Sequence, residues 1–143
     1  MEKAVLVVCV FFCLLPVTLS SLGQRQRVIV KGRLLCGNAP ASNIRVKLVD
    51  EDDGPDPDDD MDDGYTNDNG EFLLDGQQTE ISPIDPVLKI YHDCNDGLPC
   101  QRKWRFKIPN KYIVDPEDSS TVMNMGTWNL EPIADDEERD CIH

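Results

Sequence analysis

Short segments in which apolar and polar residues alternate recur along the chain after residue 27. The clearest spans residues 44–50, where aliphatic positions alternate with the basic Arg45 and Lys47. A period of two is typical of a half-buried antiparallel strand. The predicted strands are separated by turn residues and lie at 28–36, 44–50, 64–66, 71–74, 87–92, 103–108 and 121–130. No segment shows helical periodicity over three turns, and six or seven short strands are separated by turn residues. The pattern therefore predicts an all-β chain folded as a β-sandwich.

Two of these strands form a hairpin around which the rest of the chain is organised. Residues 87–92 and 103–108 flank a concentrated turn signal at Asn95–Pro99. Pro109 ends the second strand because proline cannot donate to a ladder.

The second strand of the hairpin has one basic face, formed by Lys103, Arg105 and Lys107, which alternate with apolar residues. The simplest interpretation is a core strand with a solvated face. The alternative is a stripe of positive charge that binds an anionic headgroup or an acidic receptor, which makes these three residues the candidate partner-binding site. On the first strand, Tyr91 and His92 fall on opposite faces, so we expect one in the core and the other exposed, with His92 structural rather than catalytic.

Residues 1–23 predict a secretory signal peptide. A lysine precedes an unbroken apolar run, a proline ends that run, and small residues follow, so that cleavage after Ser20 or Gly23 fits the pattern. The run is too short to span a bilayer of about 30 Å. We therefore expect one soluble, secreted domain at 24–143.

The predicted mature chain contains four cysteines, and an even number in an oxidising compartment predicts two disulfides. Three connectivities are possible. The hairpin favours Cys94–Cys100, because the ends of neighbouring strands come within disulfide reach, and this leaves Cys36–Cys141. A zinc site that uses these thiolates with His92 is the competing interpretation. Because the paired CxxC spacing is missing, we expect no metal and no cofactor.

The formal net charge of −13 is concentrated in two segments. Residues 50–63 hold ten carboxylates in fourteen positions, and residues 135–140 hold five in six. The first segment predicts a mobile, solvated acidic loop and the second an acidic C-terminal tail. A chain of this charge is not expected to bind nucleic acid. Asp58, Asp60 and Asp62 could offer oxygen ligands to calcium, but their spacing does not fit an EF-hand.

Several segments together resemble the transthyretin-like family of secreted nematode proteins. They are Val30–Cys36, Val46–Asp52, Asp68–Phe72, Asp85–Cys94, Pro99–Cys100, Ile108–Pro109 and Asp140–Cys141. The run Lys-Ile-Tyr-His-Asp-Cys at 89–94 is the specific part of the match. The resemblance implies a transthyretin-type seven-stranded antiparallel β-sandwich, secretion, and a role at the cell surface or between cells. At least one member of the family is reported to bridge dying cells to an engulfment receptor.

The resemblance thus implies a non-enzymatic extracellular binding protein, an adaptor or intercellular signal, whose partner is a protein receptor or a cell-surface lipid. The alternative is a carrier of a small apolar ligand, which requires a pocket at an oligomer interface. A hydroxyisourate hydrolase is less favoured, because enzymes of that kind use several histidines, an arginine and a C-terminal Tyr-Arg-Gly-Ser. This chain has only His92 and His143 and ends in Asp140-Cys141-Ile142-His143, so no enzymatic activity is expected.

Overall fold

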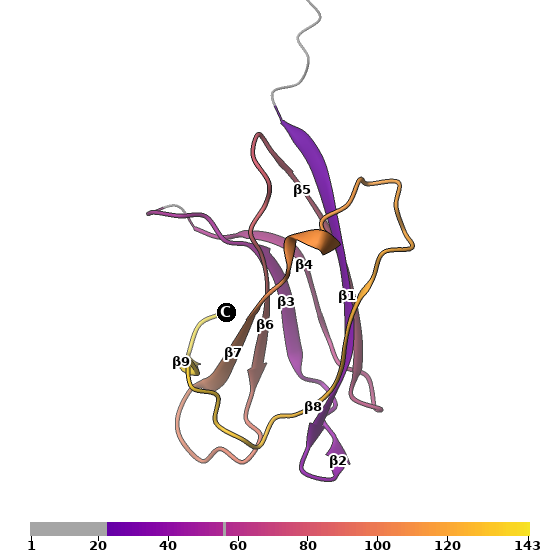
Figure 1. The fold of residues 1–143 in the computed structure, drawn as a ribbon. Coiled ribbons are helices and arrows are strands. Elements are labelled where there is room, and N and C mark those ends of the chain that lie inside the picture. Colours follow the sequence, from indigo (N-terminus) through magenta and orange to yellow (C-terminus); the bar gives the residue numbers. More distant parts are fainter. Residues whose placement is uncertain (1–22, 56) are drawn as a thin grey trace, which may run out of the picture.

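The computed structural model describes residues 23–55 and 57–143, and in this part of the chain two β-sheets pack face to face (Figure 1). All of the predicted signal peptide except its last residue lies outside the described residues. Within the described part, no helix is long and apolar enough to cross a membrane. The all-β sandwich predicted from the alternating pattern is confirmed.

The first sheet is built on β1 (Gln24–Cys36). This strand pairs antiparallel with β5 (Glu71–Glu80) and with the short β2 (Ala39–Pro40), and it pairs in parallel with β8 (Met123–Asn129). The parallel pair departs from the antiparallel sandwich that the resemblance implies. Parallel neighbours need a crossover rather than a tight hairpin. Residues 108–122, which include the 3-10 helix η1 (Asn110–Tyr112), carry the chain across to β8.

The second sheet has the strand order β4-β3-β6-β7-β9. Its strands are β3 (Arg45–Asp50), β4 (Asp59–Tyr65), β6 (Pro86–His92), β7 (Gln101–Lys107) and β9 (Glu138–Asp140). The described residues therefore form nine strands where seven were predicted. The additional strands are the two-residue β2 and the three-residue β9.

The acidic segment at 50–63 is a loop only in its first half. From Asp59 it forms the edge strand β4, whose carboxylates lie beside basic residues of β3. The guanidinium of Arg45 is 2.7 Å from Asp63, and the ammonium of Lys47 is 3.5 Å from Asp60. Opposite charges on facing strands stabilise the pair. The prediction of a solvated loop is therefore wrong for the second half, where the ladder with β3, the opposite charges and the packing of Met61 against the core support a strand.

The core lies between the inner faces of the two sheets and follows the predicted alternation. The buried apolar residues that form it include Val28, Val30, Leu34, Val46, Leu48, Leu74, Ile84, Leu88, Ile90, Trp104, Ile108 and Leu130. Trp104 and Ile108 point inward from the hairpin, as predicted, and Phe106 is partly buried. Each sheet therefore keeps an outer face free for charged residues.

Gly70 closes the turn before β5 and touches the first sheet. Its φ is +78°, and an added Cβ would lie 2.2 Å from the carbonyl oxygen of Leu34, which itself accepts a hydrogen bond from Ala41. We expect Gly70→Ala to destabilise the fold by roughly 2–5 kcal/mol, the cost of a left-handed alanine plus that of a backbone overlap. Gly126 is the matched control, because it has a φ of +75° with no atom near its missing side chain. Chemical unfolding of both variants measures the two losses in free energy of unfolding. Equal losses would show that the overlap with Leu34 is relieved and adds nothing to the cost of the left-handed conformation.

Candidate functional site

Two disulfides join the four cysteines, in a pairing that differs from the predicted one. Cys36 bonds to Cys94 and Cys100 bonds to Cys141, with Cα–Cα distances of 5.7 Å and 4.4 Å. The number of disulfides is confirmed. The predicted pairs, Cys94–Cys100 and Cys36–Cys141, are wrong.

The structure shows why the hairpin argument fails. The antiparallel register of β7 and β9 continues into Cys100 and Cys141 as the next opposed pair, so these two cysteines meet across the ladder. Cys94 is buried beyond the end of β6 and meets Cys36 at the end of β1. The Cys36–Cys94 bond therefore connects the two sheets, and the Cys100–Cys141 bond fastens the C-terminal tail to the hairpin.

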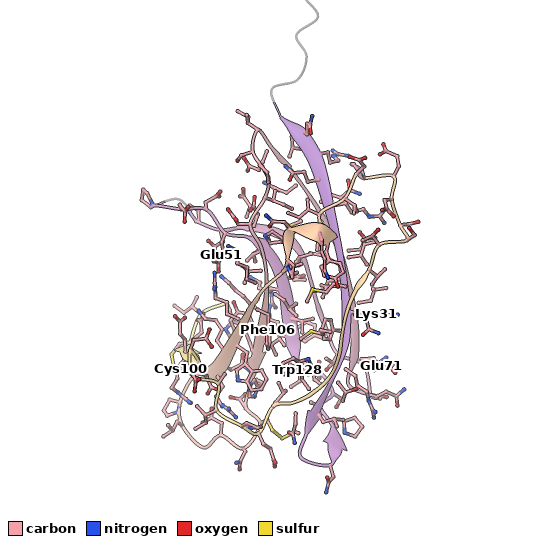
Figure 2. All side chains as sticks on the ribbon, viewed as in Figure 1. Lys31, Glu51, Glu71, Cys100, Phe106 and Trp128 are labelled. Carbon is pink, nitrogen blue, oxygen red and sulfur yellow. A yellow bond between two sulfur atoms is a disulfide. The ribbon has the colours of Figure 1, made fainter. Side chains whose placement is uncertain are left out.

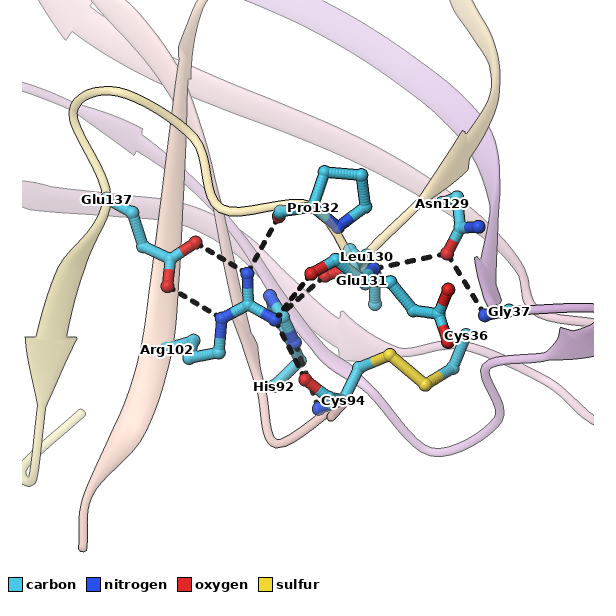
Figure 3. The surroundings of a disulfide bond; sticks show 10 residues. All are labelled: Cys36, Gly37, His92, Cys94, Arg102, Asn129, Leu130, Glu131, Pro132 and Glu137. Atoms are coloured by element: carbon cyan, nitrogen blue, oxygen red, sulfur yellow. Dashed lines mark hydrogen bonds and ion pairs between the residues drawn. A yellow bond between two sulfur atoms is a disulfide. The ribbon is translucent and has the colours of Figure 1, made fainter. Parts of the chain in front are cut away.

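Arg102 is a buried hub beside the Cys36–Cys94 bond (Figure 3). Its guanidinium donates to both carboxylate oxygens of Glu137, at 2.6 and 2.8 Å. It also donates to four main-chain carbonyls, those of Cys94, Leu130, Glu131 and Pro132. Arg102 thus holds the hairpin, the first disulfide and the C-terminal segment together.

The ion pair of Arg102 and Glu137 is almost completely removed from solvent. The hydrogen bonds from Arg102 lower the pKa of Glu137 to about 2 against the opposing effect of burial, and the indole of Trp104 donates a further bond at 2.7 Å. Sequence analysis missed both residues. A signal was present, because the period of two in β7 puts Arg102 on the same inward face as Trp104, where a basic residue needs a partner.

Six basic side chains share the outer face of the second sheet. They come from its three central strands, β3, β6 and β7, and are Arg45, Lys47, Lys89, Lys103, Arg105 and Lys107. We call this set the cationic face. Within it, Lys47, Lys89 and Arg105 stand directly opposite one another on neighbouring strands. Since neighbouring strands are about 4.8 Å apart, the sheet holds three positive charges in one row.

Carboxylates of the same chain lie over this row. Figure 2 labels Glu51 on the side of the second sheet. Its two oxygens bind the guanidinium of Arg105, which lowers the pKa of Glu51. The ammonium of Lys89 lies 2.6 Å from Asp58 and 3.7 Å from Glu51. With the contact between Lys47 and Asp60 described above, every cation of the row has an acidic partner.

The predicted partner-binding residues do lie on one face, as the alternation indicates. Lys103 is 2.7 Å from Glu138, and Arg105 is bound by Glu51. Lys107 is the most exposed of the three, at 66%, and its ammonium lies 3.9 Å from Asp85. Lys107 is therefore the least engaged of the three cations. A role for them in partner binding stays a prediction.

Comparison with known proteins places these features in a family. The transthyretin-like family matches residues 31–109. Transthyretin-like protein 5 of Caenorhabditis elegans is 43% identical over 135 residues, which cover 94% of this chain and 97% of that protein. The chain belongs to the transthyretin-like family. The resemblance inferred from the sequence is confirmed.

Two further C. elegans proteins of this family are more similar over a shorter length. Transthyretin-like protein 46 is 50% identical over 119 residues, which cover 82% of this chain and 66% of that protein. Transthyretin-like protein 33 is 49% identical over 119 residues, which cover 82% of this chain and 83% of that protein. None of these names states an enzymatic activity. A solved Cyanothece 9R-lipoxygenase shares 21% identity over 73% of this chain and 16% of its own, with a TM-score of 0.42.

The two histidines of this transthyretin-like chain are both engaged in structure. His92 is fully buried, accepts a hydrogen bond from the backbone of Cys94, and meets the ring of Trp104 edge-on. Burial, reinforced by the charge of Arg102, lowers its pKa to about 4, so the ring is neutral at physiological pH. His143 stacks on Tyr91, with ring centroids 4.2 Å apart. Tyr91 is therefore buried as well, and the expectation that either Tyr91 or His92 is exposed is wrong.

The carboxylates weighed as calcium ligands have separate partners. Asp58 and Asp60 face lysines of the cationic face, and Asp62 accepts a hydrogen bond from the backbone of Asp75 at 2.9 Å. A different group, Asp50, Asp52 and Glu80, brings its carboxylate oxygens within 4.8 Å of one another. Burial raises the pKa of Asp50, which accepts a hydrogen bond from the backbone of Asp85.

Proposed function

We propose that this transthyretin-like protein is secreted and acts outside the cell as a non-enzymatic binding protein, an adaptor or a signal between cells. In this proposal the cationic face contacts an anionic region of the partner. The observation that carries the proposal is the gathering of six of the chain's 14 lysines and arginines on one face of three neighbouring strands.

Placing these cations side by side destabilises the sheet unless acidic groups neutralise them. Like charges directly opposite each other on neighbouring strands are destabilising, and Lys47, Lys89 and Arg105 form such a row. If this face served only to contact solvent, each strand could carry a mixture of acidic and basic residues instead of basic residues alone. In a chain with 27 acidic residues, a surface this rich in cations is the part that best complements an anionic partner.

The disulfides support an extracellular site of action. All four cysteines of the described chain are paired, and disulfides persist in oxidising compartments. This agrees with the signal peptide predicted from residues 1–23.

Binding to cells tests the proposed surface. Arg105→Gln combined with Lys107→Gln should weaken salt-sensitive binding of the labelled protein about five- to thirtyfold, because each exposed charge contributes roughly 0.5–1 kcal/mol. These two have the most exposed side chains among the ion-paired residues of the cationic face, so the fold should persist. The control is Arg25→Gln with Arg33→Gln, which removes equal charge from exposed positions of the first sheet. Equal effects of the two double variants would refute the assignment of the surface.

A carrier function is the second candidate, and one hollow favours it. A cavity of about 480 Å³ opens on the outer face of the first sheet, lined by Lys31, Asn67, Phe72, Leu73 and Asn124 among others. Lys31 and Leu73 are opposed across β1 and β5, and both are exposed. Figure 2 labels Lys31 on the side of the first sheet, away from Glu51. A stable oligomer, detected by sedimentation, would favour a carrier.

A further inference from the structure

The row of cations is covered by the chain's own acidic segment. Glu51, Asp58 and Asp60, which we call the acidic cover, supply the carboxylates that face the row. Under this cover the side chains of Lys47 and Lys89 are each only 14% exposed. A partner that approaches from solvent therefore meets the acidic cover before it meets these two lysines.

The acidic cover is anchored through its backbone at two points. At one end, the backbone N–H of Glu51 donates to the carbonyl of Asp85 at 3.1 Å. At the other end, Asp60 belongs to β4 and is paired with β3. Asp58 lies between these ends, outside any strand, and its side chain is 32% exposed. Its carboxylate can leave Lys89 without breaking the β3–β4 ladder.

We propose that the acidic cover is an internal substitute for an acidic polypeptide segment of the partner, which must displace it to bind the cationic face. This inference rests on the proposed function. The cover itself shows the chemistry that the row accepts, namely carboxylates carried on a polypeptide. Because the cover is part of the same chain, it competes at a high effective concentration. Segments with several carboxylates displace it, and isolated charges do not.

The surroundings of the row favour a polypeptide over a membrane. The acidic strand β4 lies on one side of the three central strands, and Glu138 and Asp140 of β9 lie on the other. A flat anionic membrane would bring its charge over both acidic borders, where it is repelled. A narrow polypeptide segment can lie over the row alone, as the acidic cover does.

A peptide probe tests the inference. The probe is a labelled synthetic peptide with the sequence of residues 50–60, and the test variant is Glu51→Gln, Asp58→Asn and Asp60→Asn. The test variant should bind the probe about tenfold or more tightly than the wild-type protein, because the internal competitor is gone. Binding should weaken with added salt and on further replacement of Lys89 by Gln.

The control variant separates the acidic cover from net charge. It carries Asp68→Asn, Asp115→Asn and Glu117→Gln, which neutralise three exposed carboxylates that lie outside the acidic segment. Equal probe binding by the test and control variants would overturn the inference, as would test-variant binding to anionic phospholipid vesicles but not to the probe. If the triple substitution impairs folding, Asp58→Asn alone serves, since Asp58 lies outside the strands. The two proposals can fail separately. If cell binding depends on Arg105 and Lys107 but removal of the acidic cover leaves probe binding unchanged, the proposed function stands and this inference fails.

Discussion

Replacing Arg102 with methionine should lower the free energy of unfolding by about 3–5 kcal/mol, because it leaves the carboxylate of Glu137 buried without its cation. Four main-chain carbonyls lose a donor at the same time. Urea unfolding at neutral pH measures the loss. Arg105→Met is the matched control on the outer face of the same strand, and it should cost about 1 kcal/mol or less. A similar loss in both variants would contradict the hub role of Arg102.

The pH dependence of stability gives an independent reading of the same ion pair. The pKa of Glu137 falls from its ordinary 4.5 to about 2 in the folded protein. The stabilisation from its ionised form is therefore fully present above pH 4.5 and is lost as the pH falls toward 2. In the Arg102→Met variant this part of the acid dependence should shrink, because the hydrogen bonds that lower the pKa are gone.

Replacing both Cys36 and Cys94 with alanine should destabilise the fold by about 4 kcal/mol, as expected for a bond that closes a loop across 58 residues. This bond joins the two sheets, so its loss acts on the whole domain. Thermal and urea unfolding of the double variant measure the effect.

The comparison with the second disulfide makes this prediction specific. Replacing Cys100 and Cys141 should cost less global stability, because the three-residue β9 can detach locally while the sandwich persists. Non-reducing peptide mapping of the wild-type protein should recover Cys36 linked to Cys94 and Cys100 linked to Cys141. Recovery of a peptide that links Cys94 to Cys100 would reject this pairing.

The hairpin shows how much of the fold the sequence predicts. The alternation from Lys103 to Ile108 places basic residues outside and Trp104 inside, and the structure confirms it. The same rule, extended by one residue, would have placed Arg102 inside and pointed to the hub. The sequence predicted only part of the cationic face. Alternation within a single strand identified Lys103, Arg105 and Lys107 of β7. The other members of the cationic face come from β3 and β6, and only their register brings them beside β7.

The sequence by itself determined the sandwich class, the inward and outward faces of the main strands, the number of disulfides and the membership of the transthyretin-like family. Only the tertiary structure decided which cysteines pair, that the acidic segment adds β4, and that Glu51 and Asp58 cover the cationic row. The physical reason is that a period of two records the side of a strand on which a residue lies. It does not record which strand comes next to it, and disulfides and ion pairs form between neighbours in space.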